Sequence, residues 1–436
     1  MYIYQELAAR AAENKPVRVG LIGAGKFGSM FLSQVPTTPG LDVAVIADLD
    51  PARAKASCTS VGWTDELIAN TKFVDDAMAM MQVGGVDVVV EATGNPVVGL
   101  VHAREAIRNG IHIVMVNVEA GGLLAEEARS AGVVYSMAYG DQPALTCEMV
   151  EWARATGFDV VAAGKGTKYL PAYHASTPDT VWDHYGLTPE QAAQAGMNSQ
   201  MFNSFLDGTK SALEMAAIAN ATGLTPPPDG LMFPAAGMDD LAHVLRPASV
   251  GGQLHHKGQV EVVSSLERDG RPVFKDLRWG VYVVIEAPND YAAACFRQYG
   301  MNTDSTGRYS AMYKPFHLIG LELNISILSA ALLNKPTGST EGFRGDVVAT
   351  AKRALKAGEM LDGEGGHTVW GKLYPADKSL EMGGLPIGLA HKVKLKSDIA
   401  ANQPVRWQDV EVDESLDAVK IRRDMETMFR PRLAAE

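Results

Sequence analysis

The stretch 16–30, PVRVGLIGAGKFGSM, decides how the first part of the chain folds. Its apolar run Val17–Ile22 has the length of a strand, and the glycines that follow have the spacing G-x-G-x-x-G. In a strand–turn–helix unit, the first glycine permits the tight turn and the second lets the backbone approach a pyrophosphate. The third lets the helix pack closely on the strand. The stretch therefore predicts a dinucleotide site at Gly23, Gly25, Lys26, Phe27 and Gly28.

The segments that follow place this turn in a larger sheet. A second apolar run, Leu41–Ala47, ends at Asp48, which lies 20 residues after Gly28 (48 − 28 = 20). This is the usual distance for a carboxylate that hydrogen-bonds the adenosine ribose. A third run ends in a turn with Thr93 and Gly94, which can lie beside the nicotinamide. The alternation of strands and helices predicts an α/β fold with a Rossmann-like, doubly wound parallel sheet.

The residues leave both NADPH and NADH open as the cofactor. Asp48 would repel a 2′-phosphate and so favours NADH. Arg53 and Lys55 follow shortly after it, and either of them could neutralise the 2′-phosphate of NADPH.

The composition limits the classes of function. The chain has 436 residues, too many for one compact core, and its 47% hydrophobic and 21% charged residues are typical of a globular protein. No apolar run approaches the roughly 20 residues of a membrane span, and the N-terminus lacks the pattern of a secretion signal. A net charge of −12 argues against binding to nucleic acids or anionic membranes. Three widely spaced cysteines predict a reduced, cytoplasmic protein.

Changes of pattern along the chain predict three domains. Residues 1–160 would form the dinucleotide-binding domain, and residues 161–342 an α+β domain for substrate binding and dimerisation. Short strands separated by Gly and Pro turns predict a small β-rich domain for residues 343–436.

Two segments of the middle region combine lysines with glycines or acids. Gly164–Tyr169, GKGTKY, follows a predicted strand and would suit an anion, and Lys165 could act as an acid near a carbonyl. A solvated loop is the alternative for this segment. The predicted helix 198–222 carries polar residues four, three and four positions apart, on one face, as an ordinary exposed helix face also would. They are Asn203, Asp207, Lys210 and Glu214, with the small residues Ser204 and Gly208 beside them.

Further candidates lie on either side of this region. Glu119 follows the fourth predicted strand, at the edge where open α/β sheets bind their ligands. Asp141 is a candidate ligand or the cap of the following helix. Arg308, Lys314 and His317 cluster with aromatic residues and could contact an anionic substrate, although a lone histidine is more often structural.

Several motifs resemble those of known oxidoreductases. VGLIGAGKFGSM, VVVEATGNPVVG, HIVMVNVEA, YSMAYGDQPA and GKGTKYLP together look like the homoserine-dehydrogenase-like group. With SFLDGTKSALEMA, MYKPFHLIGLE and the C-terminal part, nearly the whole chain is more similar to the 1-deoxy-D-xylulose 5-phosphate reductoisomerase-like proteins. In the C-terminal part, LKAGEMLDG and KSDIAANQPVRWQDV resemble a SAF-type module.

The resemblance implies a homodimer that converts 1-deoxy-D-xylulose 5-phosphate to 2-C-methyl-D-erythritol 4-phosphate with NADPH, in isoprenoid biosynthesis. This chemistry needs an acid/base near the substrate hydroxyls and cations on its phosphate, and Mg²⁺ or Mn²⁺ would chelate the hydroxyl and carbonyl oxygens. The metal ligands stay open among Glu119, Asp141, Asp207 and Glu214.

The candidate residues divide by role. The catalytic candidates are Lys210, Lys165, Asp207 and Glu119, with Lys210 preferred as the acid/base. The candidates for substrate binding are Asn203, Ser204, Arg308, Lys314 and His317. Two alternatives differ from the reductoisomerase: a homoserine-dehydrogenase-like enzyme for another small substrate, and a non-catalytic dinucleotide-binding sensor or scaffold.

Overall fold

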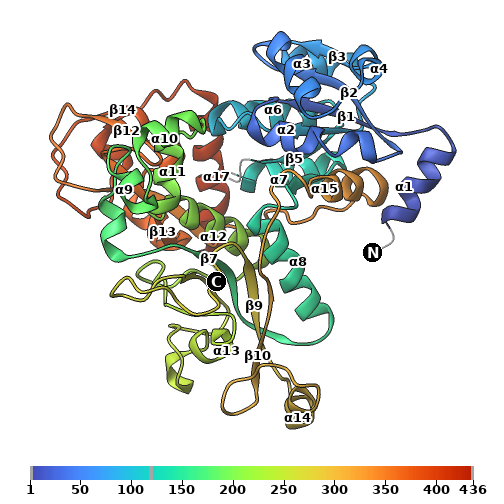
Figure 1. Cartoon of the computed structure of the whole chain (residues 1–436). Helices are drawn as coiled ribbons and strands as arrows, with labels where there is room; N and C mark the ends of the chain where they lie inside the picture. Colours follow the sequence, from blue (N-terminus) through green and yellow to red (C-terminus); the bar gives the residue numbers. More distant parts are fainter. Residues whose placement is uncertain (1–2, 117–120, 434–436) are drawn as a thin grey trace. The chain divides into compact units, whose positions relative to one another are not determined.

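The chain divides into two compact units in this computed structural model, which describes residues 3–116 and 121–433 (Figure 1). Unit 1 comprises Met1–Glu148 and His317–Glu341, and unit 2 comprises Met149–Phe316 and Gly342–Glu436. The chain therefore enters unit 2, returns to unit 1 and then enters unit 2 again. The C-terminal β-rich region belongs to the same unit as most of the predicted middle domain.

Unit 1 is built on a six-stranded parallel sheet with the order β3-β2-β1-β4-β5-β6. This is the order of a doubly wound dinucleotide-binding sheet, so the predicted fold class is confirmed. The strands are β1 Val17–Ile22, β2 Leu41–Ala47, β3 Lys72–Val74, β4 Val88–Glu91, β5 His112–Met115 and β6 Tyr135–Met137. The helices are α1 Ile3–Ala12, α2 Lys26–Leu32, η1 Val35–Thr37, α3 Pro51–Ser60, α4 Asp65–Asn70, α5 Ala77–Val83, α6 Pro96–Arg108, α7 Gly121–Ala131 and α8 Gln142–Ala155, which runs on into unit 2.

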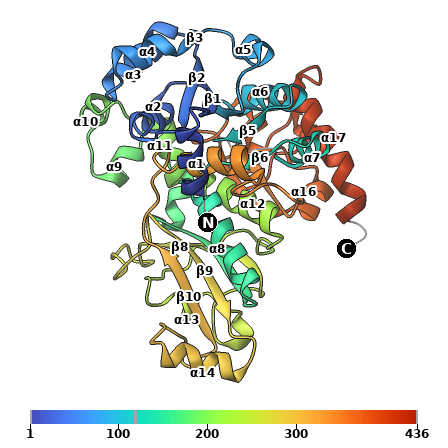
Figure 2. The same ribbon diagram turned by 90° about the vertical axis from the view of Figure 1, so that its right-hand side faces the viewer.

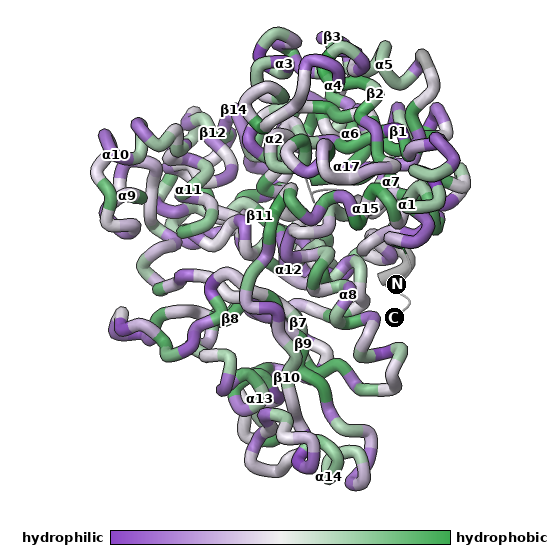
Figure 3. Tube along the Cα trace, turned by 45° about the vertical axis from the view of Figure 1, so that its right-hand side comes forward, coloured by the Kyte–Doolittle hydropathy of each residue, from purple (hydrophilic) through white to green (hydrophobic). Residues whose placement is uncertain are grey.

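The core of unit 1 lies on both faces of this sheet. Strands β1 and β2 are hydrophobic almost throughout (Figure 3), because helices cover parallel sheets on both sides. The returning segment forms α15 Asn324–Leu328 and the π-helical turn Ser329–Leu333, and it buries Leu323 and Ile327 in the same core. Figure 1 shows α15 beside α1, although more than 300 residues separate them in the chain.

Unit 2 contains a four-stranded sheet with the order β10-β9-β7-β8, in which only β7 and β8 are parallel. Figure 2 shows these strands with α13 close to β10. The strands are β7 Asp159–Thr167, β8 Gln259–Ser264, β9 Val281–Glu286 and β10 Tyr309–Lys314. The helices are η2 Pro171–Ala175, α9 Val181–Tyr185, α10 Pro189–Gln194, α11 Ser199–Leu206, α12 Thr209–Thr222, α13 Leu241–Val244, η3 Ala248–Val250 and α14 Asp290–Gln298.

The C-terminal part of unit 2 is rich in strands, as predicted, and packs on the same helix as the four-stranded sheet. Helix α12 contacts β7 and β8 as well as β11 and β13. The small sheets pair β11 Gly345–Ala351 with β13 Val369–Pro375, and β12 Met360–Asp362 with β14 His391–Leu395 and β15 Val410–Glu411. The helices are α16 Ala376–Met382, η5 Ile387–Leu389, η6 Trp407–Asp409 and α17 Asp417–Leu433. Within the described residues, no helix is both long enough and apolar enough to cross a membrane.

Candidate functional site

The backbone geometry of the three glycines after β1 suits the three roles that their spacing predicts. Gly23 has φ +93°, and a Cβ there would lie 2.8 Å from the carbonyl oxygen of Ala92. A Cβ on Gly28 would lie 2.4 Å from the carbonyl oxygen of Gly23, so no side chain fits at either position. Around Gly25, by contrast, no atom lies within 4 Å of the Cβ position. The residues thus fit a dinucleotide whose pyrophosphate approaches the backbone at Gly25, beside the exposed Lys26 and the half-buried Phe27.

Asp48, directly after β2, is held by this turn. Its Oδ2 accepts a hydrogen bond from the Ala24 N–H at 2.9 Å, and its Oδ1 pairs with the Arg53 guanidinium at 2.7 Å. Burial opposes ionisation, but the N–H groups of Asp50 and Ala24 and the Arg53 guanidinium together lower the pKa of Asp48. The Asp48 side chain is 3% exposed and that of Arg53 is 61% exposed. A ligand would therefore meet the cation of this pair first.

We expect Arg53→Ala to weaken NADPH binding about fivefold and to leave NADH binding equal or tighter. The variant removes the exposed cation and leaves the Asp48 carboxylate unneutralised. Fluorescence titration of both cofactors measures the two dissociation constants. Lys55→Ala is the matched control, because Lys55 is exposed on the same helix. A loss of NADPH preference in the Lys55 variant alone would assign the 2′-phosphate to Lys55 instead.

The turn after β4 completes this edge of the sheet. Thr93 lies against the glycine turn, with its Cα 3.1 Å from the position of a Gly23 Cβ. Its N–H and hydroxyl both donate to the buried carboxylate of Glu91, and His102 Nδ1 lies 3.5 Å from the same oxygen. Gly94 has φ +72° and open space around it. The structure thus brings Thr93 together with the glycine turn.

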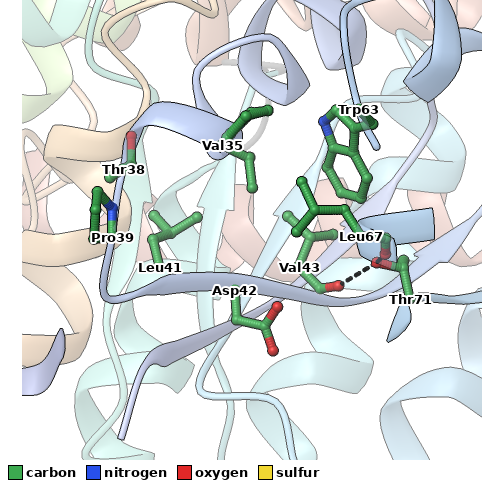
Figure 4. Close-up of a pocket in the computed structure, with 10 residues that line it drawn as sticks. Val35, Thr38, Pro39, Leu41, Asp42, Val43, Trp63, Leu67 and Thr71 are labelled. Carbon is green, nitrogen blue, oxygen red and sulfur yellow. Dashed lines mark hydrogen bonds between the residues drawn. The ribbon is translucent and has the colours of Figure 1, made fainter. Parts of the chain in front are cut away.

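A small pocket of about 200 Å³ in unit 1 lies elsewhere (Figure 4). It is lined mainly by apolar residues of η1, the beginning of β2, α4 and the turn before α4, among them Val35, Leu41 and Trp63, with Thr38, Asp42 and Thr71 as polar members. Asp48 lies beyond the other end of β2, so this pocket is separate from the glycine turn.

The predicted helix 198–222 is two helices, which corrects one expectation. Gly208 has φ +91°, a left-handed conformation that ends α11 and lets α12 begin at Thr209. Asp207 does not share a continuous helix face with Lys210 for this reason. Its Oδ1 accepts from the Thr209 N–H at 2.9 Å, and its Oδ2 pairs with Lys352 Nζ at 2.8 Å.

A buried ion pair joins the four-stranded sheet to α12. The Lys165 ammonium on β7 contacts the Glu214 carboxylate, and the two residues are 6% and 3% exposed. Lys210 lies one helical turn before Glu214 on α12 and is half-buried. The structure therefore brings together three of the predicted residues: Lys165, Lys210 and Glu214.

Sequence reasoning missed Glu364, which lies in the loop between β12 and β13. Burial raises the pKa of its carboxyl, whereas the charge of Lys210 and a hydrogen bond with Ser204 lower it. The loop is fixed on α11, because Gln200 Nε2 donates to the Glu364 carbonyl at 2.9 Å and Asn203 Nδ2 donates to the Gly365 carbonyl at 2.8 Å. The only local signal was the glycine-rich run GEGG at 363–366.

Two residues that were predicted to bind the substrate make hydrogen bonds within the protein. Asn203 is fully buried, and besides Gly365 it bonds the Ser176 hydroxyl at 2.7 Å. The Ser204 hydroxyl donates to the Met201 carbonyl at 2.8 Å. Both side chains hold α11 in place under the cluster.

The first four residues of the segment GKGTKY form neither of the two predicted loops, the anion-binding one or the solvated one. Gly164–Thr167 is part of β7, the strand between β8 and β9. A Cβ on Gly166 would lie 2.0 Å from the Leu277 carbonyl oxygen, and the Gly166 N–H donates to the Gly280 carbonyl. Glycine at these positions lets neighbouring backbone segments pack closely against β7.

Of the three residues predicted near MYKPFH, Arg308 lies far along the sheet from Lys314. Lys314 and Lys165 both pair with Val281, in one row across the sheet. Arg308 precedes Tyr309, which pairs with Glu286 near the other end of β9. Its guanidinium binds the Asp290 carboxylate at 2.7 Å. His317 begins the segment that belongs to unit 1.

The expected Mg²⁺ or Mn²⁺ site stays a prediction. In residues 3–116 and 121–433, no three His, Cys, Asp or Glu side chains gather so as to hold a metal ion. Asp207 and Glu214 each face a lysine, and Asp141 accepts a hydrogen bond from the Gln142 N–H at the start of α8. Glu119 lies outside the described residues.

Two family models match adjoining parts of the chain. The GFO/IDH/MocA model, described as an oxidoreductase family with an NAD-binding Rossmann fold, matches residues 17–139. The model described as the catalytic domain of oxidoreductase DRL matches residues 140–323, which contain Lys165, Lys210 and Glu214. No curated protein matches the chain.

Solved structures show weaker similarity. A putative oxidoreductase from Klebsiella pneumoniae is 17% identical over 72% of this chain and 84% of its own, with a TM-score of 0.34. Myo-inositol dehydrogenase from Lactobacillus casei, in complex with NAD(H) and myo-inositol, is 17% identical over 38% of this chain and 50% of its own, with a TM-score of 0.29. Biliverdin reductase from Synechocystis, in complex with biliverdin and NADP⁺, is 18% identical over 41% and 55%, with a TM-score of 0.27. The chain spans about half the length of the inositol dehydrogenase and the biliverdin reductase.

Proposed function

We propose that this NAD(P)-dependent oxidoreductase transfers a hydride between its nicotinamide cofactor and a carbonyl or alcohol carbon of a small polar substrate, with Lys210 as the acid/base. The observation that carries the proposal is the cluster of Lys210 with the buried pair Lys165–Glu214 in the segment that matches an oxidoreductase catalytic domain. The Rossmann region that matches residues 17–139 supports the cofactor.

The residues of the cluster suit the two needs of this reaction. When bound, NAD(P)H supplies the hydride. As the carbonyl carbon accepts it, negative charge develops on the carbonyl oxygen, and that oxygen must gain a proton. The half-buried Lys210 donates this proton and takes it back in the reverse direction. Lys165, held by Glu214, adds a fixed positive charge beside the same helix.

Glu364 acts through Lys210 in this proposal. The Lys210 charge acts on the Glu364 carboxyl, and the attraction between the two groups orients Lys210 before the hydride arrives. Glu364 comes from the C-terminal part of the chain, outside both segments that match family models.

A second candidate is NADPH-dependent reductoisomerisation of 1-deoxy-D-xylulose 5-phosphate. The motif SFLDGTKSALEMA favours it, because this motif carries Lys210 and Glu214 of the cluster. The homodimer and the SAF-type module that come with this resemblance stay predictions.

One assay separates these functions. NADPH and NADH oxidation is followed by absorbance with a panel of small carbonyl compounds, and separately with 1-deoxy-D-xylulose 5-phosphate with and without Mg²⁺ or Mn²⁺. Simple reduction of a panel member supports the dehydrogenase. Formation of 2-C-methyl-D-erythritol 4-phosphate establishes the second candidate. Tight cofactor binding without turnover of any compound contradicts both and supports the sensor or scaffold.

A further inference from the structure

Two cations of unit 2 lie on one aromatic ring. Lys168 follows the end of β7, and Arg278 lies in the turn before β9. The Lys168 ammonium is 5.6 Å from the centre of the Tyr185 ring, and the Arg278 guanidinium carbon is 5.9 Å from the same centre. Arg278 also lies 4.7 Å from the Trp279 ring. Both cations are therefore held in place by contacts that leave their charge unneutralised.

No ion pair neutralises either cation within the part of the chain that the structure describes. The Lys168 ammonium donates to the His184 carbonyl, and the nearby Asp276 carboxylate accepts from the backbone N–H of Arg278 rather than from its guanidinium. Other cations of unit 2 do find carboxylates; they include Lys257, Arg271 and Lys275.

Two cations that contact the same ring repel each other unless an anion joins them. Burial lowers the pKa of Lys168, and the charge of Arg278 lowers it further. An anion between the two would remove this repulsion and gain charge-assisted hydrogen bonds from both. Burial raises the pKa of the Tyr185 phenol, so its hydroxyl stays a neutral hydrogen-bond donor beside them.

We propose that Lys168 and Arg278 form a subsite for an anionic group of the substrate, a phosphate or a carboxylate. The proposal rests on the catalytic role assigned above to the Lys165 cluster. Lys168 comes three residues after Lys165, about 10 Å along an extended chain. This separation is of the order of the length of a small substrate. The planar guanidinium of Arg278 can donate hydrogen bonds to two oxygens of either anion, and the Lys168 ammonium acts as a point charge.

The test measures binding of inorganic phosphate and, separately, of acetate to the full chain by calorimetry. NADPH is kept saturating, so that its own phosphate sites are filled. We expect Arg278→Gln and Lys168→Gln each to weaken binding of the preferred anion at least about tenfold. Lys275→Gln, in the same turn but paired with Asp239, should bind as the unaltered chain does. Preference for phosphate or for acetate identifies the anionic group.

The outcomes separate this subsite from the proposed activity. Equal anion binding by the unaltered chain and both variants, or no binding of either anion, overturns the subsite without any bearing on turnover. If both variants lose anion binding as expected but no substrate is turned over, the anion site is supported. The catalytic role of the cluster is then refuted. Where a substrate is found, Arg278→Gln should raise KM for it and leave kcat within about twofold, because the residue binds without touching the reacting atoms.

Discussion

Lys210→Ala should lower kcat by about 10²- to 10⁴-fold while NAD(P)H binding and the folded structure stay unchanged. Loss of a positioned acid/base removes proton transfer in the transition state. Lys210 is a residue of unit 2, whereas the glycine turn belongs to unit 1. Steady-state kinetics with the substrate found in the assay gives kcat, and thermal unfolding checks the fold. Lys275→Ala, at an exposed lysine of the same unit, is the control and should leave kcat unchanged.

The buried pair needs a different design. Removing Lys165 alone leaves the Glu214 charge buried and unpaired, which destabilises the fold. A loss of activity could then come from unfolding and not from a lost catalytic role. The double variant Lys165→Met with Glu214→Leu removes both charges and keeps apolar volume. We expect it to fold and to lose turnover as Lys210→Ala does. A double variant with full activity would show that the pair is structural.

The sequence predicted the glycine turn and its partners because their requirements are local. Gly23 needs a left-handed φ, Gly28 needs close packing, and Asp48 follows from the distance to the glycines. These requirements can be read from spacing, and the six-stranded sheet follows from the alternation of strands and helices.

The cluster in unit 2 could be predicted only in part. Helical spacing placed Lys210 and Glu214 on one face, but the break at Gly208 depends on a left-handed conformation that an unbroken polar pattern hides. Lys352 and Glu364 are more than 140 residues from Asp207 and Lys210 in the chain, and nothing in a single sequence reports such contacts. Arg278 was missed for the same reason, since only the folded sheet brings it to Tyr185.

A buried arginine binds the last helix, α17, to the rest of unit 2. Arg422 pairs with both carboxylate oxygens of Asp346 on β11, at 2.9 and 2.6 Å, and its Nε donates to Glu426 at 2.9 Å. The side chains of Arg422 and Asp346 are 7% and 6% exposed. Removal of the guanidinium would leave the Asp346 charge buried without a cation, with the Ser379 hydroxyl still donating to it. Because β11 leads directly to Lys352, which pairs with Asp207, the same contact supports the frame of the cluster.

Arg422→Met should therefore lower the free energy of unfolding by about 3–5 kcal/mol, the usual effect of breaking one side of a buried ion pair. Urea unfolding followed by circular dichroism measures it, with Lys420→Ala on the same helix as the control. Lys420 is exposed and pairs only with Asp417 in the described chain, so its loss should change the free energy by less than about 0.5 kcal/mol. Adding Asp346→Leu to Arg422→Met removes the unpaired charge and should restore part of the stability. If the double variant is no more stable than Arg422→Met, packing around the guanidinium and not its charge holds α17 in place.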